Sequence, residues 1–410
     1  MASFLPYGRQ TIEEDDIAAV AECLRGDYLT TGPMVETFEA SLRDATGAKF
    51  AIACSNGTAA LHLAALAAGL GPGDQVIVPS LTFLATANAP HLAGADVVFA
   101  DVDASTGLLT AETLLEALRR APQAKAVFPV HLNGACVEMA KIRQVASLNK
   151  LSLIEDACHA LGTIYHEGGQ EGLIGDSFYS DMCAFSFHPV KAIAMGEGGA
   201  VTTNTPALAD ALRLLRNHGM TRDGVSFTQS EEARDRNGRI NPWYYEMAQP
   251  GFNYRVPDIL CALGVSQLRK LERFISRRRQ LAAQYDAAFA DLSPILTPVI
   301  GPGQHGSAYH LYAVSISFDA LRITRAQLMD ELRAAGIGTQ VHYFPVHRQP
   351  YYRAKIGNLH LPGADSYYAG ALSLPLFPAM QDEDVERVAS TLRKLLVSSA
   401  GRVPTMAQAN

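Results

Sequence analysis

Lys191 lies in a segment whose composition could support covalent chemistry. It stands between an apolar run that ends in "CAFSFH" and the glycine-rich "GEGG" at 196–199. Glycines clustered beside a lysine indicate that another group approaches the main chain closely. Most surface lysines are merely solvated, but an amine with a lowered pKa becomes a nucleophile towards a carbonyl. Lys191 is therefore the first candidate for chemistry.

Two adjacent carboxylates, Glu155 and Asp156, end the apolar part of "LIEDACHA". An acid at the carboxyl end of a parallel strand lies at the edge where ligands bind in open α/β sheets. The alternative is a carboxylate that only caps the next helix. This segment alone leaves both interpretations open.

The stretch "SNGTAALHL" places Ser55 to Thr58 at the start of an apolar helix. Free N–H groups and the helix dipole at such a start would hold an anion such as phosphate. An ordinary N-cap is the commoner interpretation when the segment is taken alone.

Together, these segments supply what a pyridoxal phosphate (PLP) enzyme requires: a lysine for the Schiff base, an acid for the pyridine nitrogen and a phosphate site. Lys191, Asp156 and Ser55–Thr58 provide these parts, and Ser186 could add a hydroxyl to the phosphate. Phe83, in "LTFLATAN", follows a strand end where its ring could stack on the pyridine. For Phe83, a core position remains the alternative.

The elements that must position these residues alternate between helix and strand from Gly47 to Asn204. The strand patterns are apolar throughout, which indicates a mostly parallel sheet covered on both faces. Helices are expected at 58–70, 87–95, 111–121 and 139–150, and strands at 75–80, 96–103, 125–131, 151–157, 182–188 and 199–204. The sequence thus predicts a large α/β domain in which the lysine segment joins the last two strands.

After Pro257 the pattern becomes that of a smaller α+β domain. Expected here are a long amphipathic helical stretch at 258–289, a strand at 308–317, a helix at 324–338, a strand and loop at 338–347 and a last helix from about Asp382. Thr324 and Gln327 would open the helix at 324–338 as a capping box.

We therefore expect three parts: residues 1–257 form an N-terminal segment and the large PLP-binding domain, 258–398 the small domain, and 399–410 a tail. The polar segment 221–247 is expected to be a functional lid or wall, because a long loop without its own structure is usually functional.

Composition limits the classes of function. The 410 residues carry a formal net charge of −7, so the excess of Lys and Arg that non-specific nucleic-acid binding requires is missing. The six cysteines include no C-x-x-C pair, and we expect reduced thiols and no metal. No secretory signal and no bilayer-spanning stretch is evident. A cytoplasmic enzyme without nucleic-acid or membrane partners is therefore expected.

The order of the motifs resembles that of the DegT-type nucleotide-sugar aminotransferases, which are fold-type I PLP enzymes. The shared motifs, within about 6–395, are "LTTGP", "SNGTAALHLA", "IEDACHALG", "SFHPVK", "GEGGAVTTN", "GFNYR" with "DI" and "ALG", and "VHYFPVH". The resemblance implies that Lys191 forms the Schiff base and that Asp156 partners the pyridine nitrogen. Sugar dehydratases of the same fold have histidine at the lysine position, so Lys191 favours amino transfer.

The resemblance also implies roles for further residues. Thr58, Ala59 and Ser186 would hold the cofactor phosphate, and His159 would lie near the ring hydroxyl. Asn253 would contact the phosphate of the cofactor in a neighbouring subunit, which implies a homodimer. The positions that match the sugar-nucleotide site are Tyr7, Leu29, Thr30, Thr31, Gly32, Gln340, Val341, His342 and Tyr343.

Within the family, "SFHPVK", "NPWYYEM" and "FNYR…DI" look most like the enzymes of pseudaminic acid biosynthesis. These aminate carbon 4 of UDP-2-acetamido-2,6-dideoxy-β-L-arabino-hex-4-ulose with L-glutamate, giving UDP-4-amino-4,6-dideoxy-N-acetyl-β-L-altrosamine. We expect the same reaction here, with Lys191 moving the proton as general base and acid.

Two alternatives stay open: 4-amination of another nucleotide ketosugar, of the perosamine, viosamine or bacillosamine type, and a PLP-holding sensor without turnover. Arg222 and Arg255 are candidates to bind the UDP diphosphate. Arg277–Arg279 are a weaker candidate, because a solvated helix face explains them better. His188 is expected to be a hydrogen-bonded structural histidine.

Overall fold

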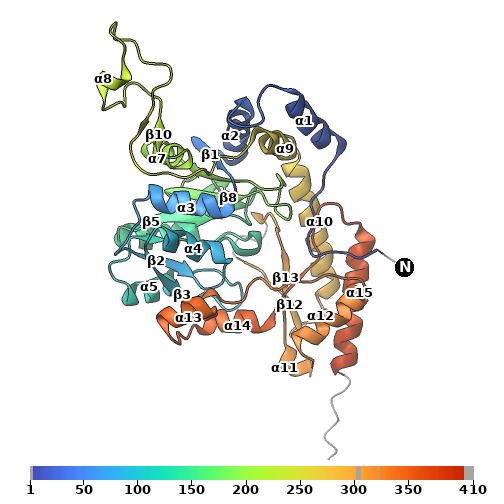
Figure 1. The fold of residues 1–410 in the computed structure, drawn as a ribbon. Helices are drawn as coiled ribbons and strands as arrows, with labels where there is room; N and C mark the ends of the chain where they lie inside the picture. Colours follow the sequence, from blue (N-terminus) through green and yellow to red (C-terminus); the bar gives the residue numbers. More distant parts are fainter. Residues whose placement is uncertain (1–2, 302–305, 322, 401–410) are drawn as a thin grey trace, which may run out of the picture.

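A seven-stranded sheet forms the centre of the larger part of the chain in this computed structural model, which describes residues 3–301, 306–321 and 323–400 (Figure 1). The strand order is β1-β9-β8-β5-β4-β2-β3. Only β9 runs against its neighbours, so the predicted, mostly parallel sheet is confirmed. The strands are β1 (Phe50–Cys54), β2 (Gln75–Pro79), β3 (Asp96–Ala100), β4 (Ala126–Val127), β5 (Ser152–Asp156), β8 (Met182–Ser186) and β9 (Gly199–Thr203).

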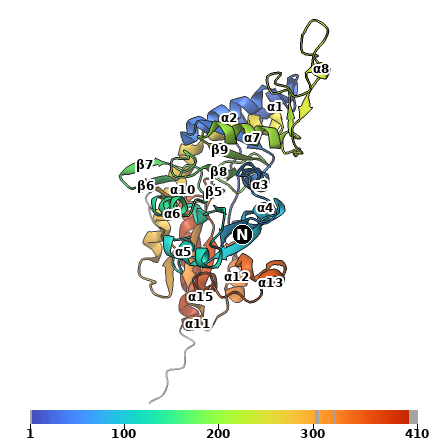
Figure 2. The ribbon, with the colours of Figure 1, turned by 90° about the vertical axis from the view of Figure 1, so that its left-hand side faces the viewer.

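Helices cover both faces of this sheet, as all-apolar strands require. Figure 2 shows α3 and α4 on one side of the strands and α5 and α6 on the other. The helices of this part are α1 (Glu14–Arg25), α2 (Pro33–Thr46), α3 (Gly57–Ala67), α4 (Leu84–Leu92), α5 (Ala111–Arg120), α6 (Met139–Leu148), α7 (Pro206–Arg216) and α9 (Asp258–Leu268). The 3-10 turn η1 (Leu132–Gly134) and the hairpin β6 (Ile164–Glu167) and β7 (Gln170–Leu173) lie at its edge.

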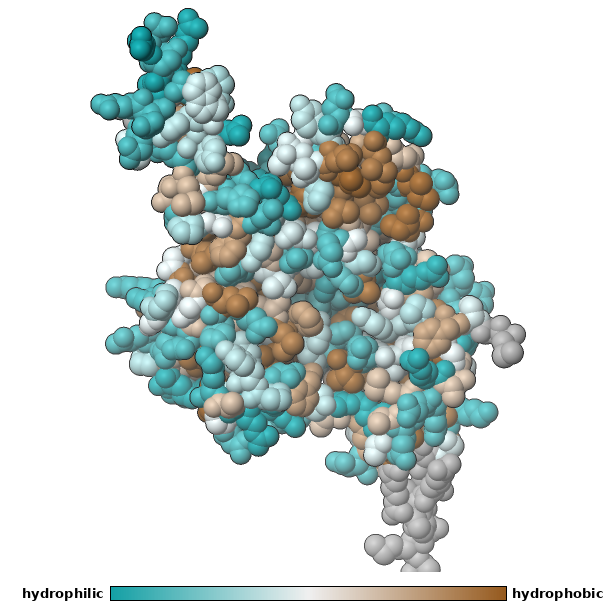
Figure 3. Space-filling view, in the orientation of Figure 1, coloured by the Kyte–Doolittle hydropathy of each residue, from teal (hydrophilic) through white to brown (hydrophobic). Residues whose placement is uncertain are grey.

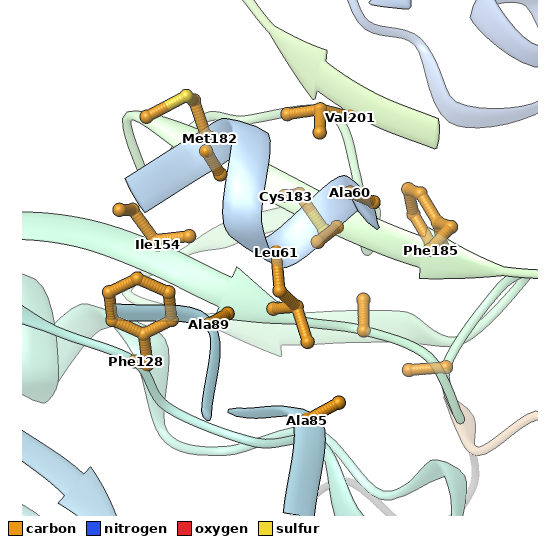
Figure 4. Close-up of a cluster of buried hydrophobic side chains, with 14 of the residues drawn as sticks. Ala60, Leu61, Ala85, Ala89, Phe128, Ile154, Met182, Cys183, Phe185 and Val201 are labelled. Carbon is orange, nitrogen blue, oxygen red and sulfur yellow. The ribbon is translucent and has the colours of Figure 1, made fainter. Parts of the chain in front are cut away.

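The core under α3 and α4 is built from small and branched side chains. Ala60 and Leu61 of α3 and Ala89 of α4 pack over Ile154 and Val201 of the sheet, all essentially buried (Figure 4). Alanines at the contact allow the helix backbone to approach the strands closely, and each large side chain buried here contributes about 1.5–3 kcal/mol. This packing fixes the start of α3 against the ends of β5 and β8.

A three-stranded antiparallel sheet and its helices form a second hydrophobic cluster. Its elements are α10 (Leu271–Phe289), β12 (Leu296–Pro298), β13 (Tyr312–Ile316), α11 (Phe318–Leu321), α12 (Arg325–Ala334), β14 (Ala371–Leu374) and α15 (Asp382–Ala400). The elements η3 (Val346–Arg348), α13 (Pro350–Ile356) and α14 (Pro362–Gly370) contribute their buried residues to the first cluster instead. The capping box of Thr324 and Gln327 and the helix start at Asp382 are confirmed.

The division at 257/258 stays a prediction, because α9 contributes to the first hydrophobic cluster whereas the end of α10 contributes to the second. Of the predicted tail, 399–410, the residues 401–410 lie outside the described residues.

The predicted helical stretch 258–289 is confirmed, although it is divided into two helices, α9 and α10. Helix α9 packs on α1 and α2, whereas α10 continues to the small sheet. One prediction about secondary structure was wrong. No strand forms at 338–347, where Gln340 makes only an isolated bridge to Ser373. The third strand of the small sheet is instead β14, which pairs with β13.

The basic row Arg277–Arg279 is not a solvated face. The Arg278 side chain is 1 % exposed and donates to the backbone carbonyls of Tyr309, His310 and Leu376. Arg279 donates to the carbonyls of 306 and 307, and Arg277 pairs with Asp382. These cations hold the small domain together, so they are also unavailable to a diphosphate.

The segment 221–247 projects from the body at the upper left of Figure 1. It contains β10 (Met220–Thr221), α8 (Ser230–Ala233) and β11 (Glu246–Met247), and it exposes Val225 and Trp243. Within the described residues, no helix is both long and apolar enough to cross a membrane.

Gly264 in α9 tests how tightly that helix packs. A Cβ there would lie 2.7 Å from Phe38 Cε2 and 2.8 Å from Met195 Sδ. Gly264→Ala is therefore expected to lower the free energy of unfolding by about 1–3 kcal/mol through overpacking, as measured by urea titration. Gly71→Ala is the control, because the nearest atom to its Cβ lies 4.0 Å away. Equal stability of the two variants would contradict this packing.

Candidate active site

A cavity of about 770 Å³ opens where β5 and β8 end against the start of α3. It is lined by segments far apart in the sequence, including the N-terminal segment, the loop after β8 and the segment 340–343. Of the predicted site residues, the cavity is lined by Tyr7, Thr58, Ala59, Phe83, Asp156, His159, Ser186, Lys191, Gln340, Val341, His342 and Tyr343.

Lys191 lies in the loop between β8 and β9. Its Nζ forms no hydrogen bond or ion pair within the described residues. Burial lowers the pKa of this amine below its ordinary value, although the nearby Cys158 and Asp156 act in the opposite direction. A larger fraction of the amine is therefore neutral near pH 7 than for an exposed lysine, which favours attack on a carbonyl.

Asp156 is the last residue of β5 and is 5 % exposed. Thr86 donates to its Oδ2 at 2.6 Å, and the backbone N–H of Cys158 donates to its Oδ1 at 3.1 Å. These donors stabilise the carboxylate in an orientation in which it can accept a further hydrogen bond in the cavity. The neighbouring Glu155 points elsewhere, since its Oε2 lies 2.6 Å from His131 Nε2.

The start of α3 is both an N-cap and a wall of the cavity. The Asn56 side chain accepts from the Ala59 N–H at 2.9 Å, which leaves the first-turn N–H groups of Gly57 and Thr58 at the cavity. A Cβ on Gly57 would lie 2.7 Å from Ser186 Cβ. Glycine is thus required for this close approach of helix and strand. The resemblance assigned Ala59 to the phosphate, but the Ala59 N–H already donates to the Asn56 side chain.

A cluster of aromatic and imidazole rings forms the opposite wall. His159 Nε2 lies 3.0 Å from Tyr343 Oη, and the His159 and His310 ring centroids are 4.2 Å apart. His342 Nδ1 lies 2.8 Å from Ser373 Oγ. Burial lowers the pKa of His159 and His310 well below the usual value and that of His342 to about 3, and Lys191 acts in the same direction. All three imidazoles are therefore neutral at pH 7.

Phe83 is 55 % exposed, so the alternative of a core phenylalanine was wrong. Its ring lies 5.9 Å from that of Tyr343, centroid to centroid, at the cavity. An aromatic ring free on one side can accept a planar ligand.

Five of the predicted site residues do not line this cavity: Leu29, Thr30, Thr31, Gly32 and Asn253. Thr31 and Gly32 line a second groove of about 1100 Å³ between α2, α7 and the base of the projecting segment. Leu29, Thr30 and Asn253 are exposed, and Asn253 forms a backbone bridge with Asn217.

The second groove contains four arginines in two different states. Arg213 and Arg216 pair with Asp210 and Glu39, at 3.0 and 2.6 Å. Arg222 and Arg255 have no carboxylate partner within the described residues, and the Nε of Arg255 is buried without a hydrogen bond. The groove thus offers two uncompensated guanidinium groups.

Sequence reasoning missed several residues in or directly behind the cavity wall. Thr86, which donates to Asp156, lies three residues after Phe83 and could have been found from helical spacing; His310 and Cys158 carry no such signal. His188 was predicted to be structural, but its side chain is exposed and lines the cavity without a hydrogen bond in the described part of the chain.

The chain was compared with known proteins. A model of the DegT/DnrJ/EryC1/StrS aminotransferase family matches residues 10–393. The spore coat polysaccharide biosynthesis protein SpsC of Bacillus subtilis is 39 % identical over 397 residues, covering 96 % of this chain and 97 % of SpsC.

Solved structures are also similar. PseC of Helicobacter pylori, an aminotransferase involved in the biosynthesis of pseudoaminic acid, superposes with a TM-score of 0.84 at 27 % identity, covering 97 % of this chain and 100 % of PseC. The PLP form of the putative sugar aminotransferase Spr1654 of Streptococcus pneumoniae gives 0.83 at 26 % identity, covering 97 % and 99 %.

The neutral His342 predicts a specific loss of stability in acid. The unfolded state binds a proton as the pH falls below about 6.5, whereas the folded state does so only near pH 3, so the free energy of unfolding falls between these values. His342→Asn keeps a polar group near Ser373 but removes the imidazole. Between pH 6.5 and 5, this variant should lose about 1.5 kcal/mol less stability than the wild type in urea titrations. Identical losses would show that His342 is protonated in the folded state.

Proposed function

Because this chain belongs to the DegT/DnrJ/EryC1/StrS aminotransferase family, whose members are PLP-dependent sugar aminotransferases, we propose a specific reaction for it. It transfers the amino group of L-glutamate to carbon 4 of a UDP-4-keto-6-deoxy-N-acetylhexosamine. The product is UDP-4-amino-4,6-dideoxy-N-acetyl-β-L-altrosamine. The observation that carries the proposal is that one cavity brings together Lys191, Asp156 and the start of α3.

The residues of the cavity fit PLP. Gly57 allows the N-terminus of α3 to lie close to Ser186, and the dipole at that end attracts a phosphate. Asp156 supplies an acceptor for a protonated pyridine nitrogen, and Lys191 supplies an amine that no other described residue binds. The exposed ring of Phe83 supplies a stacking surface.

We assign the roles as follows. Thr58, the α3 N-terminus and Ser186 hold the phosphate; Ala59 joins them only if Asn56 releases its N–H. When bound, PLP supplies an electron sink that tolerates negative charge on the carbon next to the transferred amine. Lys191 would hold the cofactor covalently.

In the half-reaction with L-glutamate, Lys191 Nζ would take the proton from the α-carbon as general base. It returns a proton to carbon 4 of the sugar in the second half of the reaction. The lowered pKa of Lys191 suits both steps, because a larger fraction of the amine is neutral and able to accept a proton near pH 7, and the protonated amine gives that proton back more readily.

We further propose that the enzyme is a homodimer. The exposed apolar side chains of Ile17, Leu24 and Leu29 lie on or just after α1, and Figure 3 shows a hydrophobic area over α1 and α9. Such a patch on a water-soluble surface is typical of a protein–protein contact. A second copy seated there would bring Asn253 and the 29–32 loop to the partner's cavity.

The second groove supports binding of the UDP diphosphate. Arg222 and Arg255 are the two arginines there without a carboxylate partner, and guanidinium groups bind phosphates in bidentate geometry. We propose that Arg222 and Arg255 bind the diphosphate of a sugar nucleotide whose sugar lies in the cavity of the partner subunit. The projecting segment 221–247 would then cover that nucleotide.

A specific observation favours a second candidate. SpsC is named for spore coat polysaccharide synthesis and is more similar in sequence than PseC is, at 39 % against 27 % identity. The alternative is 4-amination of another nucleotide ketosugar, of the perosamine, viosamine or bacillosamine type, for a surface polysaccharide.

The covalent role of Lys191 predicts an optical signature. The protein purified with PLP should show an absorbance band near the edge of the visible range, and Lys191→Ala should abolish this band and amino transfer while retaining the far-UV circular dichroism. Lys49→Ala, at an exposed lysine, is the control and should leave the band unchanged. A band that survives Lys191→Ala would contradict the assignment.

The choice of sugar can be tested with the pyridoxamine form of the enzyme, prepared with excess L-glutamate. Mixing it with a panel of UDP- and dTDP-4-ketosugars should restore the PLP band fastest with UDP-2-acetamido-2,6-dideoxy-β-L-arabino-hex-4-ulose. A response only to another ketosugar would replace the proposed substrate by the alternative.

A further inference from the structure

Helix α9 carries the "DI…ALG" motif, to which the proposed reaction gives no role. At its first residue, the Asp258 carboxylate accepts from the N–H groups of Gly32 at 2.8 Å and Met34 at 3.0 Å. In its middle, Gly264 packs against Met195 of the lysine loop. The helix therefore contacts two of the segments that the site requires.

The last turn of α9 holds a buried amide whose hydrogen-bonding groups are all engaged. Gln267 is 1 % exposed, and its Oε1 accepts from the Ala194 N–H at 3.2 Å. Its Nε2 donates to the Thr11 carbonyl at 3.0 Å and to Asp16 Oδ2 at 2.8 Å. One side chain thus connects the loop of Lys191 with the N-terminal segment.

Both connected segments line the cavity a few residues away from these contacts. Lys191 is three residues before Ala194, and Tyr7 is four residues before Thr11. The N-terminal segment is otherwise fixed near Tyr7 by backbone bonds of Leu5 and Tyr7 to the small domain.

The far side of the amide is anchored by charge. Asp16 is fully buried, and Lys270 Nζ lies 2.8 Å from its Oδ1 and 2.6 Å from Asp15 Oδ1. An amide held between an ion pair and two backbone groups has one orientation, because flipping it would place its N–H₂ against the Ala194 N–H.

We propose that Gln267 is a positioning residue that holds the Lys191 loop and the Tyr7 segment in one fixed relation. The proposal rests on the proposed function, in which Lys191 moves the proton. Gln267 does not line the cavity and acts through the backbone at Ala194 and Thr11 and through the side chain of Asp16. A small displacement of a proton-transferring group is costly, since a shift of about 1 Å can slow a reaction about a hundredfold.

Two substitutions distinguish the contact of Gln267 with Ala194 from its contact with Thr11. Gln267→Leu removes the acceptor and the donors, so hydrogen exchange should accelerate in both 187–196 and 5–13, measured without cofactor. The single-turnover rate with L-glutamate should fall by about tenfold or more. Gln267→Glu keeps an acceptor for Ala194 but loses the N–H donor to Thr11 and places a second carboxyl against Asp16. Faster exchange should therefore be confined to 5–13, and the L-glutamate rate should stay within about threefold of wild type.

Asn204→Leu is the matched control. Asn204 also bridges backbone groups, accepting from Lys49 N–H at 2.9 Å and donating to the Asp176 carbonyl at 2.7 Å, but it lies outside the cavity. At a comparable loss of melting temperature, this variant should change neither the exchange of the two segments nor the L-glutamate rate.

The proposal is overturned if Gln267→Leu matches Asn204→Leu in rate, or if exchange accelerates in only one segment. If Gln267→Leu does not fold, the proposal is tested with Gln267→Glu alone. Accelerated hydrogen exchange at 187–196 in that variant would refute the proposal. A wild type that transfers no amino group from L-glutamate refutes the proposed function instead, and the exchange data then still report on the coupling.

Discussion

The site depends on the placement of an amine and a carboxylate in one desolvated cavity. Burial makes the neutral form of Lys191 more favourable, and the donors around Asp156 keep its carboxylate oriented. In water neither effect would be large, because solvent would screen the charges and compete for the hydrogen bonds. The sheet, the covering helices and the ring cluster with Tyr343 all exclude water from this space.

The parallel sheet makes this arrangement predictable from sequence. Asp156 and Ser186 end adjacent parallel strands, so their side chains had to lie at the same edge, and the helix start at Gly57 had to pack there too. Residues whose position follows from a strand end or helix start were therefore placed correctly in the cavity. The alternation of helix and strand patterns was sufficient to predict the mostly parallel sheet of the large domain.

The remaining errors concern contacts that sequence periodicity does not encode. The row Arg277–Arg279 was taken for a solvated face because its partners, carbonyls and Asp382, come from the small domain. His310 reaches the cavity from the loop before β13, a segment that carries no motif. Leu29, Thr30 and Asn253 lie on the surface of the single chain, and a role for them in catalysis requires a second chain.

The buried Arg278 constrains how the cavity can open. Its guanidinium joins α10 to the backbone of His310, a residue of the cavity wall, and to Leu376 after the small sheet. Moving His310 away from α10 would leave the Arg278 cation in a dry interior, at a penalty that the lost carbonyl could no longer offset. Opening of the cavity by a local displacement of this wall is therefore disfavoured, and any larger movement must carry α10, His310 and Leu376 together as one unit.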